Sequence, residues 1–128
     1  MSAILQQAPS GTRPAGRWEK YKAAVGGLKE YWYPVTTAAE LRRKKRQVAT
    51  ILGEKLVLFY EQGGFYALLD RCPHRQVPLS MGRMEFPGHI SCIFHGWTFD
   101  LKTGELVAAL TDGPSSPVTR KACVLPKH

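Results

Sequence analysis

Two short motifs, each combining a cysteine with a histidine, constrain most strongly what this chain can fold into. The first is Cys72-Pro73-His74 and the second is Cys92-Ile93-Phe94-His95, with 17 residues between them. A tight loop can aim two such side chains at one point, and closing the longer connection between the motifs costs entropy that grows only slowly with length. We therefore expect a fold in which two loop tips meet at one metal site.

The mixed composition of the motifs bears on which metal they hold. Two thiolates and two imidazoles suit tetrahedral zinc, and they also suit a [2Fe–2S] cluster in which two histidines replace two cysteines on one iron. Zinc fingers and ribbons generally pair cysteine with cysteine and histidine with histidine, whereas each motif here supplies one of each. This arrangement favours the cluster, and a zinc or nucleic-acid-binding module is the alternative.

Most of the remaining sequence has the pattern of short β-strands joined by turns. Glycine-containing turns are expected at residues 53–54, 62–64 and 102–104. Strands at such regular spacing predict a mainly β protein with antiparallel hairpins, arranged as a small barrel or sandwich. The expected strands are 48–52, 55–61, 65–69, 89–93, 97–101 and 106–110.

The N-terminal part of the chain differs from this pattern. Residues 1–16 are rich in Pro, Gly, Ser, Gln and Ala, lack the apolar centre of a secretory signal, and are expected to be a flexible segment before a domain spanning 17–128. Residues 31–37 are aromatic and β-branched, which is typical of a strand, and Pro34 suggests that this strand lies at the edge of a sheet. A short N-terminal helix is predicted from apolar residues at three- and four-residue intervals, namely Trp18, Tyr21, Val25, Leu28 and Trp32.

Size and composition limit the class of protein. A chain of 128 residues is one domain's worth, and it has no apolar run near the ~20 residues of a membrane span. Three cysteines argue against a disulfide framework and favour a reducing, cytoplasmic location. The net charge is +8, and five of the basic residues form the run 42–46. We interpret this run mainly as a solvated loop. The lack of interleaved aromatics argues against contact with a nucleic acid, and a docking patch for an acidic electron donor is the third interpretation.

The extended motifs resemble a known family. Cys72-Pro73-His74-Arg75 and Cys92-Ile93-Phe94-His95-Gly96-Trp97 resemble the Rieske motif in the terminal oxygenase (alpha) subunits of aromatic-ring-hydroxylating oxygenases. Residues 104–106 and 110–114 are similar to the subgroup that contains the carbazole angular dioxygenase. Further stretches similar to these subunits are 33–35, 52–57, 69–71 and 77–82.

This resemblance implies a Rieske-type fold, with antiparallel sheets and a small two-loop subdomain that binds one [2Fe–2S] cluster. Cys72 and Cys92 would hold the outer iron, while His74 and His95 would hold the inner iron. Four further residues are expected around the cluster. Arg75 would position the loop or be a plain surface residue, Pro78 would belong to a hydrophobic cover, Gly96 would allow close backbone approach, and Trp97 would shield the cluster or be simple core.

The implied function is one-electron transfer. A reductase or ferredoxin would supply the electron, and a mononuclear-iron oxygenase domain would accept it. Relatives continue into that catalytic domain, whereas only His89 and His128 remain here once the ligands are assigned, so no catalytic residue is predicted. The domain is therefore expected to be truncated at its C-terminal strand, with a homotrimer implied for a full subunit. A free-standing Rieske ferredoxin is the alternative, and the oxygenase substrate is not encoded in these residues.

Overall fold

A computed structural model describes residues 31–113, 115–120 and 122–125 of the chain. The chain divides into two compact units with the boundary between Trp32 and Tyr33, and every element named below belongs to the second unit. The predicted flexible segment 1–16 lies outside the described residues, and so does the predicted helix apart from its last residue, Trp32, which is not helical. The elements are, in order, α2 (Ala38–Lys44), β1 (Arg46–Ile51), β2 (Glu54–Glu61), β3 (Gly64–Leu69), η2 (Leu79–Met81), β4 (His89–Ser91), β5 (Trp97–Asp100), β6 (Leu106–Ala109) and η3 (Pro117–Arg120).

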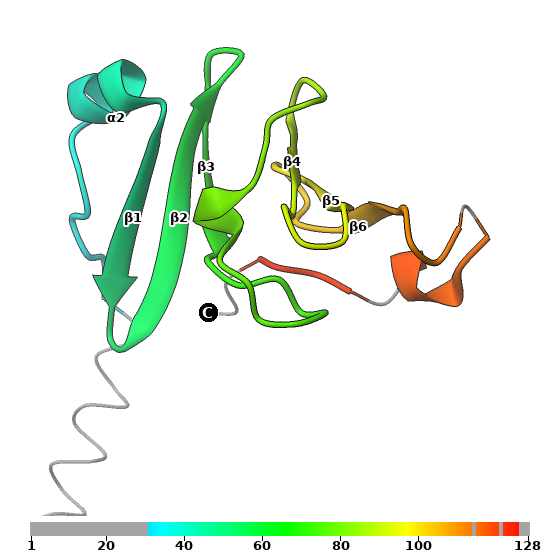
Figure 1. The fold of residues 1–128 in the computed structure, drawn as a ribbon. Helices are drawn as coiled ribbons and strands as arrows, with labels where there is room; N and C mark the ends of the chain where they lie inside the picture. The colour runs from blue at the N-terminus through cyan, green and yellow to red at the C-terminus, as the bar shows by residue number, and fades with distance from the viewer. Residues whose placement is uncertain (1–30, 114, 121, 126–128) are drawn as a thin grey trace, which may run out of the picture. The chain divides into compact units, whose positions relative to one another are not determined.

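The six strands form two antiparallel sheets of three strands each. Sheet A has the order β1-β2-β3 and sheet B the order β4-β5-β6, so each is a simple meander (Figure 1). The predicted mainly β class and the six predicted strands are confirmed, with ends that differ by one or two residues. The described residues contain no helix long and apolar enough to cross a membrane.

Both hairpins of sheet A use two-residue turns. Ile51 pairs with Glu54 across the first turn, so the turn residues are Leu52 and Gly53, one position earlier than predicted. Both have positive φ, 48° and 84°, as do the corresponding residues of the second turn, at 49° and 83°. Positive φ at both central positions is the requirement of a type I′ turn, whose twist matches that of the flanking strands.

The described C-terminal segment connects the two sheets. The amide of Leu69, at the end of sheet A, donates to the carbonyl oxygen of Val124 at 2.8 Å, and the amide of Val124 donates to Gly104 beside sheet B at 2.8 Å. Val124 is buried in the core that the two sheets share. The largest buried side chains of that core include Phe59, Leu68, Leu79, Ile90, Phe99 and Leu101.

Two expectations for the segment before sheet A are wrong. Residues 31–37 form no strand, and residues 42–44 belong to helix α2 and not to a loop. The Thr37 hydroxyl accepts a hydrogen bond from the amide of Glu40 at 3.2 Å, so it caps the helix, and Leu41 is buried beneath it. Glu40 also pairs with Lys44 one turn later at 2.7 Å. A cap, a buried leucine and this i,i+4 pair explain why a helix forms here.

The meander places α2 and the first cysteine motif at opposite ends of sheet A. β1 leads away from α2, β2 returns, and β3 leads away again toward Asp70 (Figure 1). The amide of Asp70 donates to the carbonyl oxygen of Lys55 at 2.8 Å, which fixes this end beside the β1–β2 turn. Strand β2 spans 8 residues, so about 25 Å of sheet separates the two ends.

Candidate metal centre

The two cysteine motifs form loops of the same construction. Residues 72–77 follow sheet A, and residues 92–97 connect β4 to β5 in sheet B. In each loop the cysteine amide donates to the carbonyl oxygen five residues later, at 2.7 Å in the first loop and 2.8 Å in the second. The amide four residues after the cysteine donates back to the cysteine carbonyl, at 2.8 Å and 3.0 Å respectively. These paired bonds close each loop at its base.

The closing residue of each loop has a left-handed backbone. It is Gly96 in the second loop, with φ of 69°, and Gln76 in the first, with φ of 62°. The sequence singles out Gly96 because glycine takes this conformation without cost, but it gives no comparable indication at Gln76. A methyl group added at Gly96 would lie 2.7 Å from Cδ1 of Leu110, so the close approach expected there is to that side chain.

The two motif cysteines meet in the core. Cys72 and Cys92 are 1% and 4% exposed, and neither forms a disulfide. Burial raises the pKa of the Cys72 thiol to about 11, and the adjacent Cys92 thiol adds to this rise. The backbone of His74 and of Arg75 acts in the opposite direction and lowers the pKa. The two loops therefore contribute one sulfur each to a single buried pair.

The motif histidines form a second pair. The ring centroids of His74 and His95 are 4.7 Å apart, with the rings nearly perpendicular at 73°. Both side chains are half-buried, so they reach the surface while the sulfurs do not. His95 Nδ1 is buried and makes no hydrogen bond to any described residue. A buried ring nitrogen left unpaired by protein is available as a metal ligand.

This arrangement of donors fits a two-iron cluster. A [2Fe–2S] cluster of the mixed type needs two sulfur ligands on one iron and two nitrogen ligands on the other. The structure provides one sulfur pair and one imidazole pair, with each loop contributing to both. In the described part of the chain, no group of three or more His, Cys, Asp or Glu side chains is arranged around a single metal ion.

A polar network connects the residues just before and just after the first loop. Asp70 is buried, and its carboxylate accepts hydrogen bonds from the Ser80 amide at 2.6 Å and the Ser80 hydroxyl at 2.9 Å. Arg46 donates through Nη1 to the carbonyl oxygens of Ser80 and Gly82, at 2.7 Å and 2.8 Å. Arg46 is thus a structural residue and not a solvated member of the basic run. Sequence reasoning missed both supports because their partners lie 10 to 36 residues away.

The segment after η2 joins the first loop to the second. The amides of Arg83 and Ser91 donate to each other's carbonyl oxygens, at 2.9 Å and 2.8 Å. Gly82 lies so close to this bridge that a methyl group on it would be 2.5 Å from the Ser91 carbonyl oxygen. Because Cys92 follows directly, this contact fixes the start of the second loop relative to the first.

The other residues singled out in the sequence occupy different surroundings. Trp97 is buried, and its indole stacks on His74 with a centroid distance of 4.6 Å and an angle of 10°. The side chains of Arg75 and Pro78 are exposed. His89 lies in β4, 3.6 Å from the Asp100 carboxylate.

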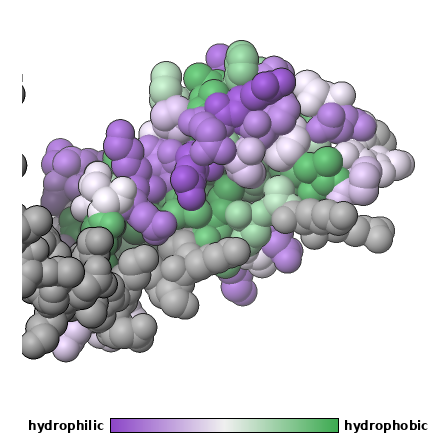
Figure 2. All heavy atoms as spheres, turned by 90° about the horizontal axis from the view of Figure 1, so that it is seen from below, coloured by the Kyte–Doolittle hydropathy of each residue, from purple (hydrophilic) through white to green (hydrophobic). Residues whose placement is uncertain are grey.

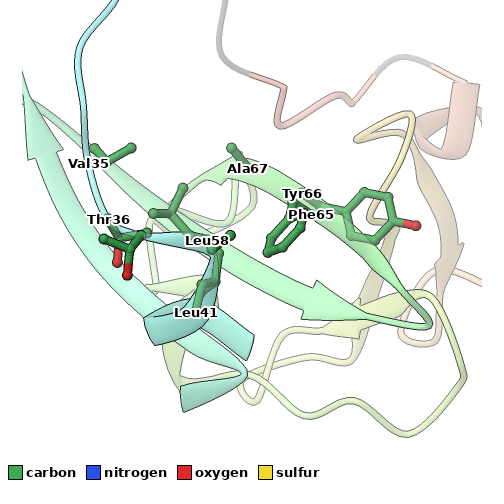
Figure 3. A pocket seen from close by; sticks show the side chains of 9 residues that line it. Val35, Thr36, Leu41, Leu58, Phe65, Tyr66 and Ala67 are labelled. Carbon is green, nitrogen blue, oxygen red and sulfur yellow. The ribbon is translucent and has the colours of Figure 1, made fainter. Parts of the chain in front are cut away.

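The remaining basic run lies far from these loops. The Arg42 guanidinium is 5.1 Å from the Phe65 ring centroid, and the Lys45 ammonium is 4.6 Å from that of Tyr60. The same end of sheet A holds a cavity of about 330 Å³ under α2, into which Leu41 and Leu58 project (Figure 3). The cavity is lined mainly by apolar side chains and includes none of the motif residues.

The chain was compared with known proteins. The Rieske [2Fe-2S] domain family matches residues 31–119. The terminal oxygenase component of carbazole 1,9a-dioxygenase from Sphingomonas sp is 41% identical over 107 residues, which cover 82% of this chain and 28% of that protein. The chloroplastic pheophorbide a oxygenase of Oryza sativa subsp. japonica is 34% identical over 125 residues, which cover 93% of this chain and 23% of that protein.

Solved structures agree with these relatives. The terminal oxygenase of carbazole 1,9a-dioxygenase from Nocardioides aromaticivorans IC177 has a TM-score of 0.66 and 40% identity, covering 73% of this chain and 26% of that one. The corresponding oxygenase from Novosphingobium sp. KA1 has a TM-score of 0.68 and 33% identity, covering 87% and 32%. The chain thus spans about a quarter to a third of these proteins. Since the family match includes both motifs, the chain belongs to the Rieske [2Fe-2S] domain family, whose cofactor is a Rieske-type [2Fe–2S] cluster.

Proposed function

We propose that Cys72 and Cys92 bind one iron of the cluster, that His74 and His95 bind the other, and that the domain transfers single electrons. The observation that carries the proposal is that two loops of equal construction each contribute one sulfur to a buried thiol pair and one ring to an imidazole pair. When bound, the cluster supplies a one-electron carrier. With two thiolates and two neutral imidazoles the oxidised site has no net charge, which makes it easier to reduce than an all-cysteine cluster.

The chain's own residues would have different roles around the cluster. The buried cysteines keep the sulfur side away from water, while the half-buried histidines bring the nitrogen side to the surface. An electron would therefore enter and leave through the imidazole edges. The buried Asp70 and the Arg46 guanidinium would keep the first loop in place during the charge change.

The surface around the histidines supports docking of protein partners. Ile93 and Phe94 are 46% and 58% exposed beside His95, and Leu110, which lies against Gly96, is 75% exposed. Figure 2 shows hydrophobic residues gathered between hydrophilic ones on the face that is seen from below the view of Figure 1. Exposed apolar groups of this kind are typical of the centre of a protein interface.

We propose a ferredoxin or reductase as the donor that uses this surface, and a mononuclear-iron oxygenase domain as the acceptor. Solved structures of carbazole 1,9a-dioxygenase include complexes of its oxygenase with ferredoxin, which supports a donor of this type. The acceptor and a homotrimeric assembly rest on the family resemblance and stay predictions. A cytoplasmic location and a domain spanning 17–128 rest on the composition of the sequence and stay predictions as well. Residues 42–45 of the basic run, at the other end of sheet A, are not part of the proposed contact.

The ligand assignment is tested by comparing each ligand with a residue of the same type. Cys72→Ser and His95→Ala are expected to lose iron, sulfide and the visible absorption bands. Cys123→Ser and His89→Ala are expected to keep all three, because Cys123 is exposed and His89 pairs with Asp100. An unsubstituted protein with one zinc per chain and no visible bands would contradict the proposal.

A further inference from the structure

Trp97 connects the two loops by both its backbone and its side chain. Its carbonyl oxygen accepts the hydrogen bond from the Cys92 amide at 2.8 Å, which closes the second loop. Its indole reaches the first loop and lies parallel to the His74 imidazole, with centroids 4.6 Å apart and an angle of 10°. Trp97 is thus bound to a cysteine of one motif and stacked on a histidine of the other.

Stacking is the specific contact of the indole. Trp97 Nε1 is buried and makes no hydrogen bond to the described residues, so ring contact and packing hold the side chain. Trp97 is only 6% exposed and is paired with Ala109 in sheet B, which leaves it little freedom to move. In contrast, the Phe94 ring that contacts His95 is 58% exposed. The buried indole is therefore the more rigid of the two aromatic contacts.

A histidine ligand needs such a contact because its outer torsion angle has a broad energy minimum. A flat, immobile ring against one face restricts the imidazole to a narrow range of planes. A second constraint on the His74 ring comes from His95, whose ring plane lies nearly perpendicular to it, at 73°. Between these two neighbours the plane of the His74 ring is determined.

We propose that Trp97 is a positioning residue for the cluster: it sets the plane of the His74 ring and keeps water from that side of the iron. This inference rests on His74 being an iron ligand. Reduction adds one negative charge to the cluster, and water stabilises that charge better than an apolar neighbour does. Loss of the indole is therefore expected to favour the reduced form.

Three variants separate stacking from ordinary packing. Trp97→Leu removes the flat ring, whereas Trp97→Phe keeps a flat but smaller ring that lacks the unpaired Nε1 group. Phe99→Leu is the matched control, because Phe99 is fully buried two residues along the same strand and has no ring contact with either histidine in the described chain. Each protein is compared with the unsubstituted one by iron content, midpoint potential and the g-values of the reduced cluster in electron paramagnetic resonance.

We expect Trp97→Leu to change the g-values and to increase the equilibrium constant for reduction about tenfold, which corresponds to ~59 mV for a one-electron couple. Trp97→Phe and Phe99→Leu are expected to change that constant by less than about twofold. If Trp97→Leu holds no iron, Trp97→Met replaces it with the same expectation, because methionine fills more of the volume without a flat ring.

Two outcomes would overturn the inference. One is a leucine or methionine variant with unchanged g-values and potential, and the other is a phenylalanine variant as strongly altered as the leucine variant. Both differ from failure of the ligand assignment, in which the unsubstituted protein would contain no [2Fe–2S] cluster or the His74→Ala variant would keep its cluster unaltered.

Discussion

Replacing Gly82 with alanine tests how the two ligand loops are held together. The backbone of Gly82 has φ of −69°, which alanine adopts without strain. The added methyl group, however, would lie 2.5 Å from the Ser91 carbonyl oxygen and 2.9 Å from that of Leu79. Both contacts are with backbone atoms, so no side-chain rotation relieves them, and β4 must move away from η2.

The cost of this movement has two sources. Overpacking of a closely packed site costs about 1–3 kcal/mol. Displacing β4 also breaks the two backbone hydrogen bonds between Arg83 and Ser91, each worth about 1 kcal/mol net. The sum is about 4 kcal/mol, equivalent to a fall of roughly 15 °C in the melting temperature of a domain of this size. Because Cys92 follows Ser91, the iron content should fall as well.

Circular dichroism melts at a fixed heating rate, together with iron analysis, provide the measurement. Gly63→Ala is the control, since Gly63 has φ of +83° with no atom within 4 Å of an added methyl group. That variant carries only the left-handed backbone penalty, about 1–2 kcal/mol, and lies at the other end of sheet A. A Gly82 variant that melts no lower than the Gly63 variant, and keeps its iron, would refute the steric argument.

Other predictions follow from single side chains. Asp70→Asn weakens two charge-assisted hydrogen bonds behind the first loop, and we expect it to lower the free energy of unfolding by about 2 kcal/mol in urea titrations, with no loss if the carboxylate is dispensable. The backbone amide of Thr103 donates to the Asp100 carboxylate and holds the pKa of Asp100 below its usual value. The stability that the ionised Asp100 contributes is therefore present above about pH 4 and is lost as the pH falls through the lowered pKa. Asp100→Asn should therefore flatten the acid side of the melting curve against pH, and an unchanged acid limb would contradict this. In the cluster-free protein the exposed Cys123 should react rapidly with a thiol reagent while the buried Cys72 reacts slowly, and Cys123→Ser should abolish the rapid phase.

The site was largely predictable because its chemistry is local in sequence. A cysteine and a histidine separated by one or two residues must share a loop, and two such loops indicate a common target. The strands were predictable for a similar reason, since their turns carry glycine where positive φ is needed, as at Gly53 and Gly63.

What was missed depends on tertiary contacts or on competing patterns. The Arg46 contact with Ser80 joins residues 34 positions apart, and no local pattern predicts it. Helix α2 was not predicted because its last residues belong to a run of charges that is typical of a solvated loop, although Thr37 carries a helix-capping side chain. At Gln76 the left-handed backbone is imposed by the loop's hydrogen bonds against the residue's own preference.

The two ligand loops come from different sheets, and this has a consequence for how the cofactor is acquired. While the protein is being synthesised, the first motif leaves the ribosome about 20 residues before the second and can present only half of the ligand atoms. The second motif is not held in shape until β5 has emerged and paired with β4. The proposed cluster could therefore be completed only after most of the domain has been translated, because a chain whose sheets have not yet come together would lack half of its proposed ligands.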